Sequence, residues 1–304
     1  MLTIPVITGP TASGKSDLVF SLAQALHTEI ISSDSIQVYQ GFNIGSAKPL
    51  PELLASVKHH FVDIINYSET YSVAMYQKMA IQTIDRMIMH GKIPVISGGT
   101  GLYLRSVIGS DHYSEVLPNE EFRATCNQES IRKGPAWLHE RLQEIDPEKA
   151  NKLHPNDKRR IIRALEIFEF SGNQMSDKKD QNPSMQRFLP KLFGLHWERN
   201  DLYQRIEQRV EQMFKDGFID EVENLRFIGV NEESTPMKSI GYKQVNQFLK
   251  GVISYEVMVE VIKKETRNYA KRQLTWNRNQ FDVIWLDPHE GVVKNIQRII
   301  AAIK

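Results

Sequence analysis

The chain has 304 residues, enough for one large or two modest domains, and its 41% hydrophobic and 25% charged residues are ordinary for a globular protein in water. A net charge of +1 excludes binding to a polyanion through overall charge, and no apolar run approaches the roughly 20 residues of a membrane span. The single cysteine, Cys126, excludes an internal disulfide and a multi-cysteine zinc site, and with no secretory signal in view we expect a cytoplasmic protein.

The first motif lies between a strand and a helix. The apolar run 4–7 predicts a short buried strand, and apolar residues at helical spacing from Leu18 to Leu26 predict a helix. The segment between them, here called the P-loop, fits G-x-x-x-x-G-K-[ST] with Gly9, Pro10, Thr11, Ala12, Ser13, Gly14, Lys15 and Ser16. Its backbone N–H groups suit phosphate oxygens, Lys15 adds a positive charge, and the Ser16 hydroxyl is a ligand for Mg²⁺. The P-loop predicts a bound phosphate chain and leaves its identity open.

Strands and helices alternate in the next hundred residues. The predicted strands are 29–32, 61–65 and 93–97, and the predicted helix is 73–90, capped by Ser72 and ended by Gly91. A polar turn, 33–39, follows one strand, and a glycine-rich loop, 98–103, follows another. Ligands of open α/β sheets bind at the carboxyl ends of strands, so both segments are candidate parts of a site. The glycines of 98–101 predict a close backbone approach there.

The pattern changes after residue 109. Residues 110–189 show only helical periodicity, interrupted by prolines such as Pro135 and Pro183, and include a helix capped by Asn156 and ended by Gly172. Strands are then predicted at 191–195 and 282–286, and helices at 199–215, 218–228, 239–250, 254–279 and 290–303. This order predicts an α/β fold like that of P-loop NTPases, with a parallel sheet and helices on both faces. Residues 1–109 and 190–304 would form the catalytic core, and 110–189 an all-helical insertion domain.

The position of one carboxylate separates the possible chemistries. P-loop kinases and NTPases carry an acid after a buried strand to hold Mg²⁺, but strand 93–97 ends in Ser97-Gly98-Gly99. The acid is Asp34, after strand 29–32, where it suits either a metal or a base beside the phosphates. Its structural alternative is a residue that stabilises an Asx turn. The residues alone therefore predict phosphoryl-chain chemistry with one well-placed carboxylate.

Several segments occur in the order typical of one enzyme family. They are Gly9–Ser16, Asp34-Ser35 with Gln37-Val38-Tyr39, Gly45–Pro49, His59-His60, Gly98–Tyr103, His154–Asp157 and Lys271–Trp276. Together they resemble the tRNA dimethylallyltransferases, the bacterial tRNA isopentenyltransferases, over essentially the whole chain. The resemblance implies transfer of a dimethylallyl group from dimethylallyl diphosphate to N6 of adenosine 37, 3′ to the tRNA anticodon, with Mg²⁺ as cofactor. Ser46 stands where threonine is usual, and the zinc finger of the eukaryotic branch is absent.

The resemblance also implies roles for single residues. The P-loop, Lys15, Thr100 and Arg209 would bind the diphosphate or a nucleotide, and Asp34 would deprotonate the N6 amine. The tRNA contacts it implies are Asp34, Ser35, Ile36, Gln37, Thr100, Arg123, Arg159, Arg160, Ile161, Ile162 and Arg163. Because N6 is enclosed in the base stack, the adenine would be extruded near 34–37. The structural alternative for Arg209 and for the run 158–163 is a solvated helix face.

A second basic segment lies near the end of the chain. It comprises Lys263, Lys264, Arg267, Lys271, Arg272 and Arg278, interleaved with Tyr269 and Trp276. Basic residues with aromatic neighbours suit phosphate contacts and base stacking, although a solvated helix face is again the alternative. We expect a monomer that binds the tRNA anticodon stem-loop and dimethylallyl diphosphate and contacts no membrane.

Three other functions are weighed against this one. An adenylate isopentenyltransferase acting on free AMP or ATP would not need the basic insertion. A nucleotide or small-molecule kinase would need an acid after strand 93–97. A non-enzymatic RNA-binding module would need neither Asp34 nor the pair Lys15-Ser16.

Overall fold

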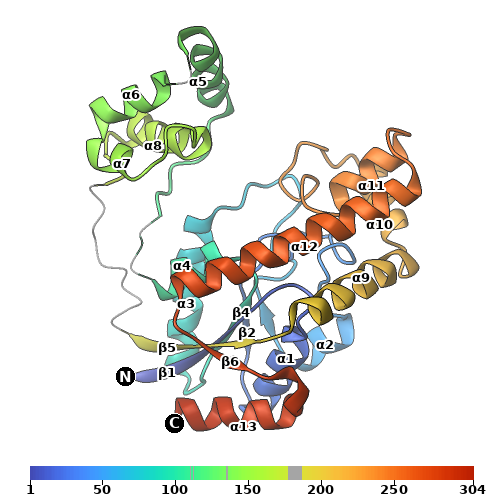
Figure 1. Cartoon of the computed structure of the whole chain (residues 1–304). Helices are drawn as coiled ribbons and strands as arrows, with labels where there is room; N and C mark the ends of the chain where they lie inside the picture. The colour runs from blue at the N-terminus through green and yellow to red at the C-terminus, as the bar shows by residue number, and fades with distance from the viewer. Residues whose placement is uncertain (110, 112, 135, 177–186) are drawn as a thin grey trace.

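The computed structural model describes residues 1–109, 111, 113–134, 136–176 and 187–304. Their core is one six-stranded parallel sheet in the order β3-β2-β4-β1-β5-β6 (Figure 1). The strands are β1 (Leu2–Thr8), β2 (Ile30–Ser32), β3 (His59–His60), β4 (Val95–Gly98), β5 (Phe188–Leu195) and β6 (Val283–Leu286). The predicted α/β class with a parallel sheet is confirmed. The strands run parallel because the connections between them cross over and return each strand to the sheet in the same direction.

Helices cover both faces of this sheet. They are α1 (Lys15–Ala25), α2 (Pro51–Ser56), α3 (Val73–Met89), α4 (Gly101–Ile108), α9 (Arg199–Lys215), α10 (Phe218–Phe227), α11 (Tyr242–Leu249), α12 (Tyr255–Gln280) and α13 (Gly291–Ile303), with a short 3₁₀ turn, η2, at Pro288–Glu290. Successive residues of β1 point to opposite faces: Val6 packs in the cluster under α3, α4 and α9–α12, and Ile7 packs under α1 and α13. Both residues are fully buried, as expected for a central parallel strand.

Four helices stand apart from the sheet (Figure 1). They are α5 (Glu120–Lys133), α6 (Trp137–Ile145), α7 (Pro147–Asn151) and α8 (Lys158–Ser171). They share a hydrophobic cluster of their own that includes Leu138, Leu142 and Leu165. Pro135, Pro183 and residue 110, where the insertion domain was predicted to begin, lie outside the described residues. The domain boundaries therefore stay predictions. β5 begins at Phe188, slightly before the predicted strand.

Several local predictions are confirmed, and two are wrong. Ser72 caps α3, since its side chain accepts a hydrogen bond from the Met75 amide, and α9 has the predicted bounds. The predicted strand 61–65 is wrong: β3 ends at His60, and Phe61 and Asp63 have φ of 65° and 55°, which breaks an extended strand. The segment is rich in apolar residues because the turn buries Phe61 and Ile65 at its two ends.

The second error concerns the start of α8. Asp157, and not Asn156, caps this helix, and its carboxylate accepts a hydrogen bond from the Arg160 amide at 3.3 Å. The short helices α2 and α4 had no counterpart among the predictions. None of the helices in the described part of the chain is long and apolar enough to cross a bilayer.

Candidate active site

Three neighbouring strands bring the candidate site loops together. β2, β4 and β1 lie side by side, and their carboxyl ends are level, since Ser32 pairs with Ser97 and Thr8 pairs with Gly98. The turn after β2, the loop after β4 and the P-loop after β1 therefore emerge at one edge of the sheet. This edge is where open α/β sheets bind their ligands.

The P-loop turns amide groups inward because other elements hold its carbonyl groups. The Arg205 Nε on α9 donates to the Ala12 carbonyl, and the Trp197 indole N–H donates to the Ser13 carbonyl, both at 2.8 Å. In a trans peptide the carbonyl and the following N–H point in opposite directions, so the Ser13 and Gly14 amides point away from these side chains. Ala12 and Gly14 have φ of 62° and 84°, the left-handed backbone of an anion-binding nest.

Two hydroxyl groups of the P-loop are candidates to bind a ligand. Ser13 is 1% exposed, and its buried hydroxyl has no hydrogen-bond partner among the residues that the structure describes. Ser16 lies exposed in the first turn of α1. A buried hydroxyl without a partner is costly unless a ligand supplies one. Together with the inward amides, these hydroxyls suit a phosphate chain.

Two cations lie beside one carboxylate at this site. Desolvation lowers the pKa of Lys15 to about 8, repulsion from Arg209 adds to the shift, and Asp34 opposes it. Desolvation also lowers the pKa of Arg209, again against the attraction of Asp34. Arg209 is half-buried on α9, so the alternative of a fully solvated helix face does not hold. Two partly desolvated cations favour an anion with several charges, such as diphosphate.

Asp34 stabilises the turn in which it lies. Its Oδ1 accepts hydrogen bonds from the backbone amides of Ile36 and Gln37 at 2.9 and 3.2 Å, which is an Asx turn. The amide of Ser35 donates to the Thr100 hydroxyl at 3.2 Å, which joins this turn to the loop after β4. No hydrogen bond to Asp34 Oδ2 is found within the described ranges. The structural role and a free carboxylate oxygen thus coexist in one residue.

Helix α12 contributes three residues that the predictions did not place beside the P-loop, although Tyr269 was expected in the second basic segment. Tyr269, Gln273 and Asn277 are spaced by four positions, so they lie on one face of the helix, and we call them the α12 clamp. Gln273 contacts the P-loop and the loop after β4, and Asn277 accepts a hydrogen bond from the hydroxyl of Thr8 at 3.1 Å. Desolvation and Asp34 raise the pKa of Tyr269 to about 12, against hydrogen bonding to Thr100 and Gln273. The four-residue spacing of these polar side chains in a predicted helix is the sequence signal that could have identified them.

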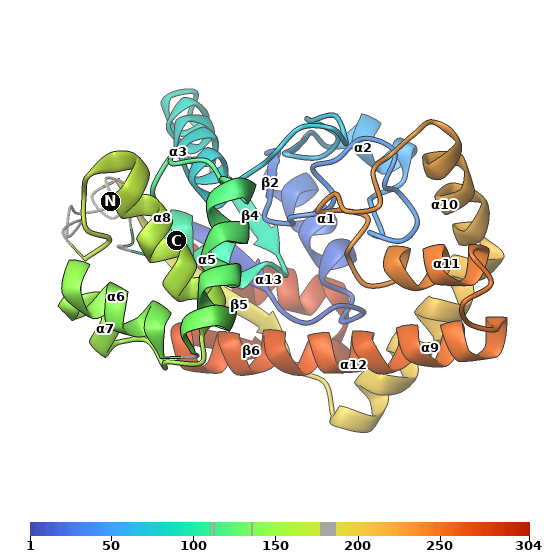
Figure 2. The same cartoon turned by 90° about the horizontal axis from the view of Figure 1, so that it is seen from above.

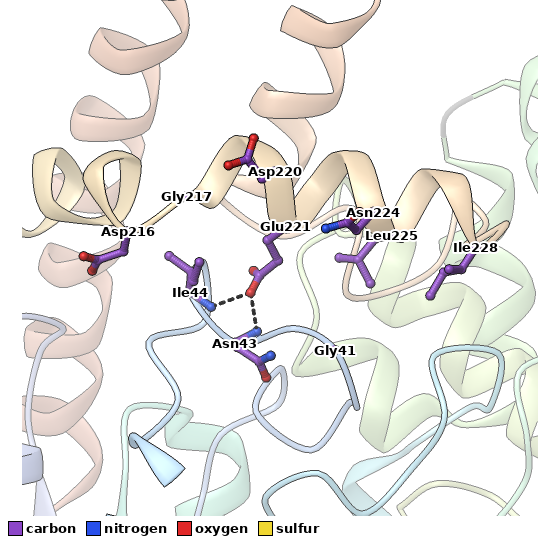
Figure 3. Close-up of a pocket in the computed structure, with 10 residues that line it drawn as sticks. All are labelled: Gly41, Asn43, Ile44, Asp216, Gly217, Asp220, Glu221, Asn224, Leu225 and Ile228. Carbon is purple, nitrogen blue, oxygen red and sulfur yellow. Dashed lines mark hydrogen bonds between the residues drawn. The ribbon is translucent and has the colours of Figure 1, made fainter. Parts of the chain in front are cut away.

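A second network positions Gln37. Its Nε2 donates to the carbonyls of Ser46 and Ala47 at 3.1 and 3.0 Å, so the loop 41–48 orients this side chain. Figure 3 shows Glu221 on α10 pointing toward that loop. Its carboxylate accepts hydrogen bonds from the backbone amides of Asn43 and Ile44, at 3.0 and 2.7 Å. The surface pocket drawn there lies between α10 and the loop, so it borders the residues that support the site.

The predicted tRNA-binding arginines of the insertion fall into two groups. Arg159 and Arg160 are exposed on α8, and Arg160 makes a long ion pair with Asp157, at 3.5 Å. Arg123 and Arg163 instead bind the fully buried carboxylate of Glu166 on α8, and Arg123 thereby joins α5 to α8.

Ile161 and Ile162 are buried in the hydrophobic cluster of the insertion. Ile161 is fully buried and Ile162 nearly so, backbone included, so the structure shows almost no exposed surface for the RNA contacts that the resemblance implies at these two positions. Of the predicted tRNA-binding residues in the described part of the insertion, Arg159 and Arg160 are therefore the exposed cations that are not paired with Glu166.

The basic residues of α12 divide in the same way. Lys263 pairs with Glu211 at 2.8 Å, and Arg267 pairs with Glu207 at 2.6 Å, so both are engaged with α9. The exposed basic residues of α12 are Lys264, Lys271, Arg272 and Arg278. Figures 1 and 2 show that α12 crosses the core as one long helix with its outer side uncovered.

Known proteins resemble this chain over its full length. The profile of the family described as IPP transferase matches residues 37–280. A protein of Thermoanaerobacter named tRNA dimethylallyltransferase is 42% identical over 99% of this chain and 98% of its own length. One of the same name from Carboxydothermus hydrogenoformans is 44% identical, over 97% of this chain and 95% of its own.

Solved structures agree with these relatives. The tRNA isopentenylpyrophosphate transferase of Bacillus halodurans has a TM-score of 0.72 and 36% identity, and the match covers 100% of this chain and 97% of that one. A eukaryotic dimethylallyltransferase described as acting on tRNA has a TM-score of 0.81 and 28% identity, over 99% of this chain and 78% of that one. Because a family profile covers most of the chain and full-length relatives exceed 40% identity, this chain belongs to the IPP transferase family.

Proposed function

We propose that this protein is a tRNA dimethylallyltransferase that transfers a dimethylallyl group from dimethylallyl diphosphate to N6 of adenosine 37 and releases diphosphate. The observation that carries the proposal is the convergence of Asp34, Lys15 and Arg209 where β1, β2 and β4 end. One site then offers a base and two cations for a leaving group. The relative described as acting on tRNA supports tRNA as the acceptor. A monomeric, cytoplasmic enzyme belongs to the same proposal.

The leaving group is the main demand of this reaction. The bond between N6 and the allylic carbon forms while the bond from that carbon to diphosphate oxygen breaks. Negative charge grows on the departing oxygen, and groups already in place stabilise it without reorganisation. Lys15, Arg209 and the inward amides of the P-loop are such groups.

The proton of N6 must leave as the new bond forms. Asp34 Oδ1 is held in its Asx turn, so Oδ2 is the oxygen that accepts this proton. The side-chain N–H₂ of Gln37 is already engaged with the loop 41–48, which leaves its carbonyl oxygen to accept a hydrogen bond from the base. The adenine must be unstacked to reach these groups.

The residues present fit Mg²⁺ bound together with the substrate. Mg²⁺ takes oxygen ligands, keeps several waters and is commonly held by substrate phosphates with few protein ligands. Ser16 offers an exposed hydroxyl at the P-loop, and the described residues contain no cluster of three or more His, Cys, Asp or Glu that would hold the ion alone. We infer that Ser16 would hold Mg²⁺, which when bound would supply further positive charge beside the diphosphate.

The proposal is tested by following a labelled prenyl group. The protein is incubated with radiolabelled dimethylallyl diphosphate and either tRNA or AMP, and ATP hydrolysis is measured in parallel. Label is expected in tRNA alone, and digestion of the tRNA should recover it on adenosine 37. Label in AMP would indicate the free-adenylate enzyme, and ATP turnover without label transfer would indicate a kinase.

Replacing Arg160 with alanine is expected to weaken tRNA binding and to reduce the slope of log K against log salt by about one. The reason is that Arg160 is exposed on α8 and free to neutralise a phosphate. Arg163→Ala is the matched control on the same helix. It removes a partner of the buried Glu166 and should lower the free energy of unfolding by about 1–3 kcal/mol.

Fluorescence anisotropy with an anticodon stem-loop at several salt concentrations, together with urea unfolding, separates the two effects. An unchanged salt slope for Arg160→Ala would return this arginine to a solvated helix face. Unchanged stability of Arg163→Ala would show that the pair of Arg163 with Glu166 does not stabilise the insertion.

A further inference from the structure

We infer that Gln273 is a positioning residue that sets the distance between the P-loop and the loop after β4; this inference rests on the proposed function. Its Oε1 accepts a hydrogen bond from the Thr11 amide and its Nε2 donates to the Gly99 carbonyl, both at 2.9 Å. One side chain therefore joins two loops that are far apart in the sequence and adjacent at the site.

The surroundings of Gln273 leave little freedom for this amide. The side chain is 7% exposed, and a Cβ on Gly99 would overlap its Nε2, so the backbone approaches it closely. The other members of the α12 clamp secure its flanks, since Asn277 binds Thr8 and Tyr269 binds Thr100. The clamp thus holds the end of β1, the P-loop and the loop of Thr100 at successive turns of one helix.

This arrangement also decides which P-loop amides face the ligand. The Thr11 amide is bound to Gln273, so it is directed away from the diphosphate, whereas the Ser13 and Gly14 amides point inward. Thr100 lies directly after Gly99, and it also accepts the amide of Ser35, which is next to Asp34. Displacing the Gly99 loop would therefore move Thr100, which links the diphosphate side of the site to the turn of Asp34.

The test replaces Gln273 with methionine, which has a similar length and cannot make either hydrogen bond. We expect diphosphate affinity to fall by about tenfold and transfer to slow by about 10–100-fold, because small displacements at a reacting centre have effects of this size. The KM for tRNA should stay unchanged, since Gln273 lies beside the diphosphate loops. Affinity is measured by calorimetry with inorganic diphosphate, which does not depend on transfer to tRNA.

Gln244→Met is the matched control. Gln244 is 2% exposed on α11, and its side chain also makes two hydrogen bonds, with the Gly241 amide at 2.8 Å and with Glu265 at 3.1 Å. Its loss should lower Tm about as much as Gln273→Met while leaving diphosphate affinity and transfer unchanged. If both variants lose affinity equally, or if Gln273→Met keeps the affinity of the unaltered protein, the inference is wrong.

A second variant covers the case in which Gln273→Met does not fold. Gln273→Asn keeps the amide but is one carbon shorter, so it can reach only one of the two loops. It should also weaken diphosphate binding, and unaltered binding would contradict the inference. If the unaltered protein binds diphosphate but labels no tRNA, the proposed function fails while the role of Gln273 in binding can still be measured.

Discussion

Replacing Asp34 with asparagine is expected to slow dimethylallyl transfer by about 10²–10⁴-fold, the range for loss of a general base. The asparagine oxygen can still accept the amides of Ile36 and Gln37, so the Asx turn should persist. What disappears is the basicity of the other oxygen. Diphosphate affinity should not fall, because the change removes a negative charge near Lys15 and Arg209.

Single-turnover transfer and diphosphate calorimetry on the same variant check this result. Asp34→Ala serves as the comparison, because it removes the turn contacts as well as the base. A slow asparagine variant with unaltered Tm would assign the loss to proton transfer. If the asparagine variant were nearly as fast as the unaltered protein and only the alanine variant were slow, Asp34 would be a turn residue and not the base.

Replacing Lys15 with methionine is expected to lower transfer by about 10²–10³-fold, as for loss of one group that stabilises a leaving group. The pH dependence is more diagnostic. The Lys15 pKa in the free protein is about 8, because of desolvation and then Arg209, with Asp34 opposing. Bound diphosphate favours the charged lysine, so a proton must be taken up on binding above that pH. Diphosphate affinity should therefore fall above pH 8, approaching about tenfold per pH unit.

Calorimetry between pH 6.5 and 9.5 measures this slope, and Lys15→Met should flatten it. Stability carries the opposite sign: the pKa of Lys15 in the folded chain lies below the ordinary lysine value of 10.5, so the unfolded chain binds more protons between pH 8 and 10.5. The contribution of Lys15 to stability should thus rise over that window. Equal slopes for the unaltered protein and Lys15→Met would show that Lys15 does not control the pH dependence.

The parts of the site that the sequence predicted are those formed by neighbours in the chain. The P-loop needs a strand, a turn with left-handed backbone and a helix start, all within Leu2–Ala25. Asp34 could be located because it follows a strand directly. The error at 61–65 has a local cause, since a turn that buries Phe61 and Ile65 produces a short apolar run like that of a strand. The error at Asn156 arose because Asp157 is an equally good cap one residue later.

The basic motifs show where sequence patterns were insufficient. Arg123, Arg163, Lys263 and Arg267 look like their exposed neighbours in the sequence. In the folded chain each meets a carboxylate from another turn or helix, and a cation already paired in this way is a weaker ligand for RNA. Which arginine or lysine is open depends on helix packing, and a charge pattern does not report packing.

The sequence by itself therefore determined the phosphate-binding loop, the acid after the second strand and the alternation that produces a parallel sheet, because short-range geometry and burial encode each of them. Only the tertiary structure decided that β2, β4 and β1 are neighbours, and so that Asp34, Thr100 and Lys15 share one edge. It alone also decided that Gln273 binds Thr11 and Gly99. The physical reason is that strand order and helix docking follow from burying the whole core at once, whereas a motif describes only residues that are close along the chain.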